Sequence, residues 1–266
     1  MTQAERRLYL IRSLLNEKTE YQSLNVPRDA GEQRKLLRSL MNVRMPKVAD
    51  KTFLRVQDEY LQQELADEGI TDLDDLRPVS GDLYLWQGDI TRLKCGAIVN
   101  AANSGMTGCY IPCHACIDNC IHTFAGVQLR QDCAALMAEQ GHEEQTGQAK
   151  ITKAYNLPCD YVLHTVGPIV SGRVTREDER LLASCYRSCL ELVEKNSVRS
   201  IAFCCISTGV FHFPNERAAE IAVETVRRYK VETGSKIKVV FNVFKDLDKT
   251  IYERLLGANC APAARA

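Results

Sequence analysis

Apolar side chains recur at helical spacing over the first 78 residues. The spacing of amphipathic helices is found at Leu8/Ile11/Leu14/Leu15, at Leu36/Leu37/Leu40 and at Phe53/Val56/Tyr60/Leu61/Leu65. Pro27, Pro46 and Pro78 separate these segments and mark their ends. The pattern predicts three or four short helices over residues 1–80. We expect them to pack as an attachment, which either covers a binding pocket or shields a sheet edge.

From Asp82 onward, short β-branched or apolar runs alternate with helical stretches. The predicted strands are Leu83–Trp86, Ala97–Ala101, Ile151–Tyr155, Tyr161–Val166, Ile201–Ile206 and Ile237–Phe241. The predicted helices lie near 117–140, 177–195, 215–230 and 247–256. Such alternation is typical of a mostly parallel α/β sheet covered on both faces, whose ligands bind at the carboxyl ends of strands. We assign this domain to residues 81–257 and predict a disordered Ala-rich tail over 258–266.

The overall composition is that of a soluble globular protein. Apolar residues make up 45% of the chain and charged residues 26%, which leaves enough material for a sizeable core. Lys+Arg and Asp+Glu both count 34. Because no global positive field exists to gather polyanions, we expect no required nucleic-acid partner and no membrane partner. An anionic ligand must instead be held by backbone N–H groups and a few placed side chains.

Targeting signals are weak or missing in this sequence. No run approaches the roughly 20 apolar residues that span a bilayer, and the N-terminus lacks the apolar core of a secretory signal. Glu5 and Glu17 weigh only weakly against an organelle transit peptide in the opening amphipathic helix. We expect a cytoplasmic protein.

The cysteines are the strongest anomaly in the composition. Of the 12 cysteines, Cys109, Cys113, Cys116 and Cys120 crowd into one short segment. In a chain of this size without a secretory signal, such a cluster favours free thiols and metal binding over disulfides. Thiolate and imidazole are the preferred ligands of zinc, and His114 lies within the same segment.

Polar and glycine-containing motifs follow three of the predicted strands. Asp89 lies in a turn after the first strand, Asn100 and Asn103 close the second, and the loop 206–214 follows Ile201–Ile206. Paired amides suit hydrogen bonds to a polyhydroxylated ligand, and the positive end of the helix after Pro214 could face a diphosphate. Taken singly, each motif could equally be a capped turn or a loop held by asparagine side chains.

In combination these motifs resemble the MacroD-type macrodomain family. The ordered signatures are Asp89, Asn100-Ala101-Ala102-Asn103, Ile121-His122-Thr123-Phe124-Ala125-Gly126, His164-Thr165-Val166-Gly167-Pro168 and Ile206-Ser207-Thr208-Gly209-Val210. The match covers roughly residues 82–256. The resemblance implies a three-layer α/β/α sandwich with a mixed, mostly parallel sheet that binds ADP-ribose.

The resemblance also implies roles for individual residues. Asp89 would accept the adenine amine beside Ile90, and Phe244 would stack on adenine, unless Phe244 belongs to the core. Asn100 and Asn103 would meet the distal ribose. The diphosphate would lie on the loop formed by Ser207, Thr208, Gly209, Val210 and Phe211.

The chain departs from the common family pattern in two places. Residues 108–118 replace the usual glycine run before the catalytic helix, and His212 stands where a glycine is usual. The first departure resembles the zinc-containing macrodomain subgroup, whose members often carry a helical N-terminal extension. That resemblance implies that Cys109, His114 and Cys116 bind zinc.

Cys113 and Cys120 are extra thiols whose role the sequence leaves open. If either thiol completes a four-ligand site, the ion has only a structural role and stabilises the loop. With three protein ligands, the fourth position is free for water or substrate. The Cys113 and Cys116 pair also suits a structural or redox interpretation.

The expected function is that of a zinc-dependent glycosidase, a hydrolase that removes mono-ADP-ribose from modified protein side chains. Asn103 and Asp118 are the candidate catalytic residues, although Asp118 could merely be a carboxylate favoured at a helix N-terminus. His164 is expected to be structural, and His122 either orients Asp118 or, as we expect, is a satisfied core histidine. The alternatives are a non-catalytic ADP-ribose reader, an O-acetyl-ADP-ribose deacetylase, and a zinc-stabilised interaction protein with a vestigial pocket.

Overall fold

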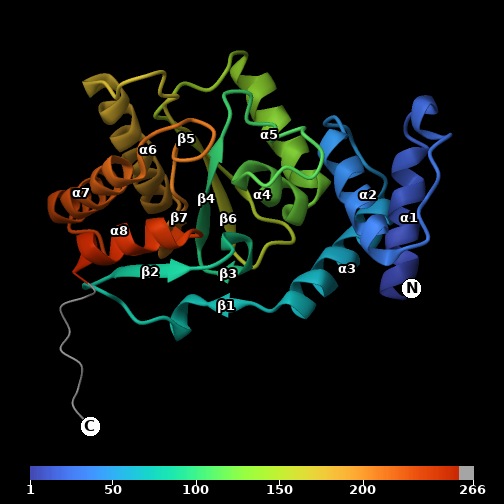
Figure 1. Ribbon diagram of the computed structural model, residues 1–266, viewed down its shortest axis with the longest axis horizontal. Coiled ribbons are helices and arrows are strands. Elements are labelled where there is room, and N and C mark those ends of the chain that lie inside the picture. Colours follow the sequence, from blue (N-terminus) through green and yellow to red (C-terminus); the bar gives the residue numbers. More distant parts are fainter. Residues whose placement is uncertain (258–266) are drawn as a thin grey trace, which may run out of the picture.

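The computed structural model of the chain describes residues 1–257 and centres on one six-stranded sheet (Figure 1). The predicted disorder of residues 258–266 lies outside the described residues. In spatial order the strands are β2 (Leu83–Gln87), β8 (Lys238–Val243), β7 (Ser200–Phe203), β4 (Ala97–Ala102), β6 (Tyr161–Val166) and β5 (Ala149–Lys153). All neighbouring pairs are parallel except β5 with β6, which is antiparallel.

Helices cover both faces of this sheet, which confirms the predicted three-layer α/β/α class. One face carries α6 (Arg176–Lys195), α7 (Asn215–Thr233) and α8 (Asp246–Leu256), and the other carries α4 (Ile117–Ala125) and α5 (Val127–Gln140) (Figure 1). The central strands are apolar runs because both of their faces are buried, and Ile98, Val99 and Val239 are fully inaccessible.

The predicted helix over residues 117–140 is broken in two at Gly126. The backbone of Gly126 has φ of 99°, which an L side chain rarely adopts. A Cβ at this position would also lie 2.6 Å from Nε2 of Gln57, a residue of the N-terminal helices. The helical periodicity of the sequence continues through this break and therefore did not reveal it.

The N-terminal residues form α1 (Gln3–Leu15), α2 (Ala30–Val43) and α3 (Lys51–Glu68). Side-chain caps begin each helix: Thr2 forms a capping box for α1, and Asp29 and Asp50 cap α2 and α3. The three helices share a small apolar core that includes Leu10, Leu37 and Val56. They pack beside α4 and α5 (Figure 1).

Short elements lie between the longer helices and strands. The two-residue strands β1 (Thr71–Asp72) and β3 (Leu93–Lys94) pair in parallel, and single 3-10 turns occupy η1 (Thr19–Tyr21), η2 (Leu73–Asp75) and η3 (Ile90–Arg92). No helix within residues 1–257 combines the length and the apolar character needed to cross a membrane. The cysteines of this part of the chain are all free.

Candidate active site and metal centre

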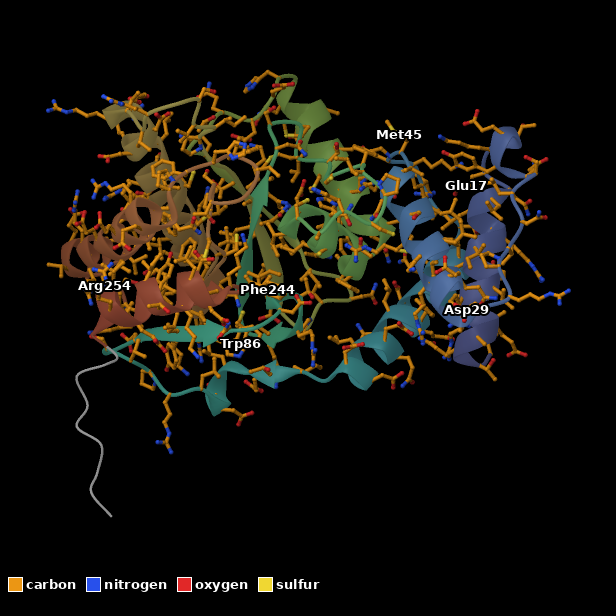
Figure 2. The ribbon with its side chains drawn as sticks, viewed as in Figure 1. Glu17, Asp29, Met45, Trp86, Phe244 and Arg254 are labelled. Carbon is orange, nitrogen blue, oxygen red and sulfur yellow. The ribbon has the colours of Figure 1, made fainter. Side chains whose placement is uncertain are left out.

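The residues assigned to adenine lie where the parallel strands β2 and β8 end side by side. The Gly88 N–H donates to the Val243 carbonyl at 3.0 Å, which places Asp89 next to Phe244. Phe244 is 75% exposed, so it lies outside the core (Figure 2). An exposed aromatic ring beside a carboxylate provides a stacking face and a hydrogen-bond acceptor for a flat heterocycle with an amino group.

Asp89 uses one carboxylate oxygen locally and keeps the other available. Its Oδ1 accepts from the Thr91 N–H at 2.9 Å and from the Thr91 hydroxyl at 2.7 Å, which begins η3. The neighbouring Ile90 is only 1% exposed. The Ile90 side chain therefore belongs to the core.

The loop after β7 presents free backbone donors. The N–H groups of Gly209, Val210 and Phe211 donate to no other group within residues 1–257. Thr208 is held instead by its hydroxyl, which donates to the Cys205 carbonyl at 3.0 Å. Successive unpaired N–H groups ahead of a helix N-terminus are typical of anion-binding loops.

Close packing and left-handed backbone shape this same loop. Ser207 is buried with φ of 64°, and a Cβ at Gly167 would lie 2.1 Å from the Ser207 hydroxyl. The backbone of Gly167 must therefore approach the loop closely. His212 has φ of 57° and is exposed, which explains why a glycine suits this position in the family pattern.

Asp118 lies in the first turn of α4 and is almost completely buried. Its side chain accepts hydrogen bonds from two amides, Asn100 Nδ2 to Oδ1 at 2.8 Å and Asn103 Nδ2 to Oδ2 at 3.2 Å. Burial raises the pKa of Asp118 to about 6, although both amide donors favour the ionised form. The result is an oriented carboxylate that can take up or release a proton near neutral pH.

The two asparagines contribute to the site differently. Asn100 is fully buried, and its Nδ2 also lies 3.2 Å from Nδ1 of His164. It therefore holds the Asp118 carboxylate by a hydrogen bond from inside the core. Asn103 is only partly buried and also donates to the Gly108 carbonyl at 3.2 Å. Asn103 thus links Asp118 to the loop that follows.

Cys109, His114 and Cys116 come together on that loop. Their ligand atoms all lie within 4.8 Å of one another, and Cys109 Sγ is 3.6 Å from His114 Nδ1. Each side chain is half-buried. Two thiols and one imidazole at this separation match the donor set that zinc prefers, and no fourth protein ligand joins this cluster within residues 1–257.

The protonation chemistry of Cys116 also fits a metal. Cys116 is the N-cap of α4, and its Sγ accepts from the Asn119 N–H at 3.4 Å, where the helix dipole favours a thiolate. Burial nevertheless raises the pKa of Cys116 to about 12. A coordinated cation reverses this effect because it deprotonates the thiol that binds it.

The two extra thiols lie outside this group. Cys113 is exposed, and its Sγ lies 3.2 Å from the Ser39 hydroxyl. Cys120 Sγ lies 3.5 Å from Nη2 of Arg38. Both thiols face helix α2 and belong to neither of the candidate metal clusters found within residues 1–257.

A second cluster of potential ligands, His122, Cys133 and His164, is completely buried. Burial lowers the pKa of His122 well below its usual range and that of His164 to about 4, so both imidazoles are neutral. His164 is also held by the Thr152 hydroxyl at 2.9 Å. The position of His164 inside a strand agrees with the structural role expected for it. His122 differs from a satisfied core histidine, because both of its ring nitrogens lack a hydrogen-bond partner within residues 1–257 and its Nε2 lies 3.6 Å from Asp118 Oδ1.

The N-terminal helices border the site from the side of α4. A cavity of about 460 Å³ separates α2 and α3 from η3 and α4, and Asp89 is the one predicted ligand-binding residue that lines it. Sequence reasoning missed Asn119, whose Nδ2 donates to the carbonyls of Cys109 at 3.3 Å and Ile111 at 2.9 Å. A single asparagine in a helical turn carries no spacing signal, so only the fold reveals this contact.

Comparison with known proteins places this geometry in a family. Residues 99–222 match the model of the Macro domain. The chain is 62% identical over 260 residues to the protein-ADP-ribose hydrolase of Treponema medium, which covers 96% of this chain and 100% of that protein. It is 50% identical over 247 residues to the enzyme of the same name from Staphylococcus aureus strain MSSA476, covering 92% of each chain.

A solved structure shares both the fold and part of the sequence. The macrodomain of Trypanosoma brucei, determined in complex with ADP-ribose, is 30% identical with a TM-score of 0.65, covering 87% of this chain and 97% of that one. The sheet order, the loops at its carboxyl edge and these relatives lead to one conclusion: the chain belongs to the macrodomain family.

Proposed function

We propose that this protein is a zinc-dependent hydrolase that removes mono-ADP-ribose from modified protein side chains. The observation that carries the proposal is the placement of Cys109, His114 and Cys116 beside a buried carboxylate, Asp118. The two relatives named protein-ADP-ribose hydrolase support the reaction, and the ADP-ribose complex of the Trypanosoma brucei macrodomain supports the ligand. Zinc dependence rests on the donor set of this chain.

The residues suggest how the ligand is oriented. Asp89 and Phe244 would hold adenine at one end, and the free N–H groups of Gly209, Val210 and Phe211 would hold the diphosphate. The distal ribose then reaches Asn103 and Asp118. Fixing both ends of a flexible ligand supplies much of the rate gain, because the reacting atoms are already held in the orientation that the reaction needs.

Hydrolysis breaks the bond between the anomeric carbon and the protein side chain through an oxocarbenium-like state. Water supplies a hydroxyl group to the anomeric carbon and a proton to the leaving side chain. Asp118 would orient that water and accept its proton, and the hydrogen bonds from Asn100 and Asn103 to the carboxylate support this role. Bound to its three ligands, zinc would lower the pKa of a coordinated water or polarise the ribose.

Two other functions use the same pocket. A reader module would bind ADP-ribose without turnover, and a deacetylase would hydrolyse the ester of O-acetyl-ADP-ribose. The buried carboxylate with its raised pKa favours catalysis over reading, since a module that only binds has no need for an oriented proton acceptor.

The deciding experiment pairs metal analysis with product release. We expect purified protein to contain about one zinc per chain and to release free ADP-ribose from a mono-ADP-ribosylated protein. Removal of metal by a chelator should abolish release, and added zinc should restore it. Full release after complete metal removal would contradict zinc dependence, whereas binding without any release would favour the reader.

The adenine contact makes a separate prediction. Replacing Asp89 with alanine should weaken ADP-ribose binding about tenfold to a hundredfold, because a charged hydrogen bond contributes about 1.5–3 kcal/mol. Calorimetry with free ADP-ribose measures this change. Asp82→Ala is the matched control, since Asp82 lies at the opposite end of β2 and pairs with Lys230. Equal affinities for wild type and Asp89→Ala would remove Asp89 from the adenine site.

A further inference from the structure

Helix α2 contacts the loop that carries the candidate metal ligands, residues 108–116, which we call the metal loop. We propose that Arg38 of α2 is a positioning residue for the zinc ligands, so that the N-terminal helices form part of the metal centre. This inference rests on the proposed zinc site. It assigns the helical extension a role in holding the catalytic geometry.

Arg38 makes the most direct of these contacts. Its Nη2 donates to the His114 carbonyl at 2.8 Å and to Asn119 Oδ1 at 3.0 Å, and it lies 3.5 Å from Cys120 Sγ. His114 is a candidate ligand, and Asn119 donates to the carbonyl of another, Cys109. One guanidinium group therefore fixes the backbone of one ligand directly and that of a second through an amide.

Asn42, one helical turn after Arg38 on α2, holds the middle of the metal loop. It is 1% exposed, its Oδ1 accepts from the Cys113 N–H at 2.9 Å, and its Nδ2 donates to the Thr123 hydroxyl at 2.9 Å. Cys113 has φ of 54°, a conformation that a side chain rarely adopts without support. The hydrogen bond from α2 provides that support next to His114.

Arg130 completes the connection from the opposite side. This buried residue of α5 donates through Nη1 to the carbonyls of Met41, Asn42 and Arg44, at 3.2, 2.6 and 2.7 Å. Its Nη2 lies 3.4 Å from the Cys109 carbonyl. The Arg130 guanidinium thus contacts both the carbonyl groups at the end of α2 and the carbonyl group of Cys109, a candidate metal ligand.

The contacts between the N-terminal helices and the macrodomain argue against helices that merely shield its apolar surface. The apolar core of the N-terminal helices is their own, and Val127 is its one member from the macrodomain. Buried polar contacts connect the two parts, and they include the Val127 N–H donating to Gln57 Oε1 at 2.9 Å. Buried polar contacts specify geometry more than they add stability, as expected for a device that orients a neighbouring loop.

A three-ligand site depends strongly on such orientation. The metal loop has no regular secondary structure, so its own backbone does not fix the three ligand atoms. Ordering each loop residue costs about 1–2 kcal/mol. Contacts that order the loop before the metal binds raise the metal affinity, because binding then no longer bears this entropy cost. Removing the partners behind the ligands typically lowers metal affinity about 10–100-fold.

The test compares zinc affinity in full-length variants by competition with a chromophoric chelator. Arg38→Met should weaken zinc binding at least about tenfold, and Arg38→Lys, which keeps one donor for the His114 carbonyl, should weaken it less. Lys35→Met is the matched control, because it removes the same charge one turn earlier, where the ammonium pairs with exposed Glu32. That control should bind zinc as the wild type does.

Spectra of the cobalt-substituted protein report ligand geometry without using activity. We expect the visible bands of Arg38→Met to shift while its affinity for free ADP-ribose stays unchanged. Wild-type zinc affinity together with wild-type cobalt bands in Arg38→Met would overturn the positioning role. An equal loss in Lys35→Met would overturn it too, because the effect would then be one of charge. Absence of zinc from the wild type would instead defeat the proposed function itself.

Discussion

Replacing Cys116 with alanine is expected to remove bound zinc and hydrolysis together and to leave ADP-ribose binding in place. Cys116 is a candidate ligand at the start of α4, whereas the adenine and diphosphate contacts lie on other loops. A metal contributes several kcal/mol to transition-state stabilisation, so the release rate should fall at least about a hundredfold. Metal content, single-turnover release and calorimetry with ADP-ribose measure the three properties on one preparation.

The neighbouring thiols provide matched controls for this variant. Cys113→Ala and Cys120→Ala should keep both zinc and activity, because their sulfur atoms face α2 instead of the other ligands. Loss of zinc from either control would point to a closed, four-ligand site. Catalysis would then have to rest on Asp118 and the asparagines alone.

Replacing Asn103 with alanine is expected to lower turnover much more than ADP-ribose affinity. Its amide donates to Asp118 Oδ2 at 3.2 Å and to the Gly108 carbonyl at 3.2 Å, so it orients the proton acceptor and joins it to the metal loop. Loss of one preorganised donor costs about 10²–10³ in kcat. The affinity for free ADP-ribose should change by less than about threefold, which corresponds to less than 1 kcal/mol.

Single-turnover release at saturating substrate separates these two effects from each other. Ser104→Ala is a suitable control, because the Ser104 hydroxyl next to Asn103 donates to Glu143 at 2.8 Å, on the exposed side of the loop. Comparable losses of turnover and affinity in Asn103→Ala would make Asn103 a plain binding residue. An unchanged melting temperature in both variants would show that the loop around Gly108 has kept its fold.

The sequence by itself determined the elements of this protein and the edge of the sheet at which its chemistry lies. Buried strands appear in the sequence as apolar runs, and α6 appears as apolar residues at helical spacing. Both patterns are visible locally because burial selects apolar side chains within each element separately. The residues after parallel strands lie at a common edge, and Asp89, Ser207 and Phe244 therefore came out at the same end of the sheet. Cys109, His114 and Cys116 are near in sequence, so one loop brings them together.

Contacts between distant segments were decided only by the tertiary structure. Gly126 breaks a helix whose periodicity is continuous, because α3 approaches it from another part of the chain. Asn100 is buried against Asp118. Arg38 and Asn42 reach the metal loop and the adjacent α4 from 71 or more positions away, with Cys113, His114 and Asn119 as partners. Such polar partners carry no repeat in the sequence. Their pairing is set by the packing of whole helices, which a local pattern does not encode.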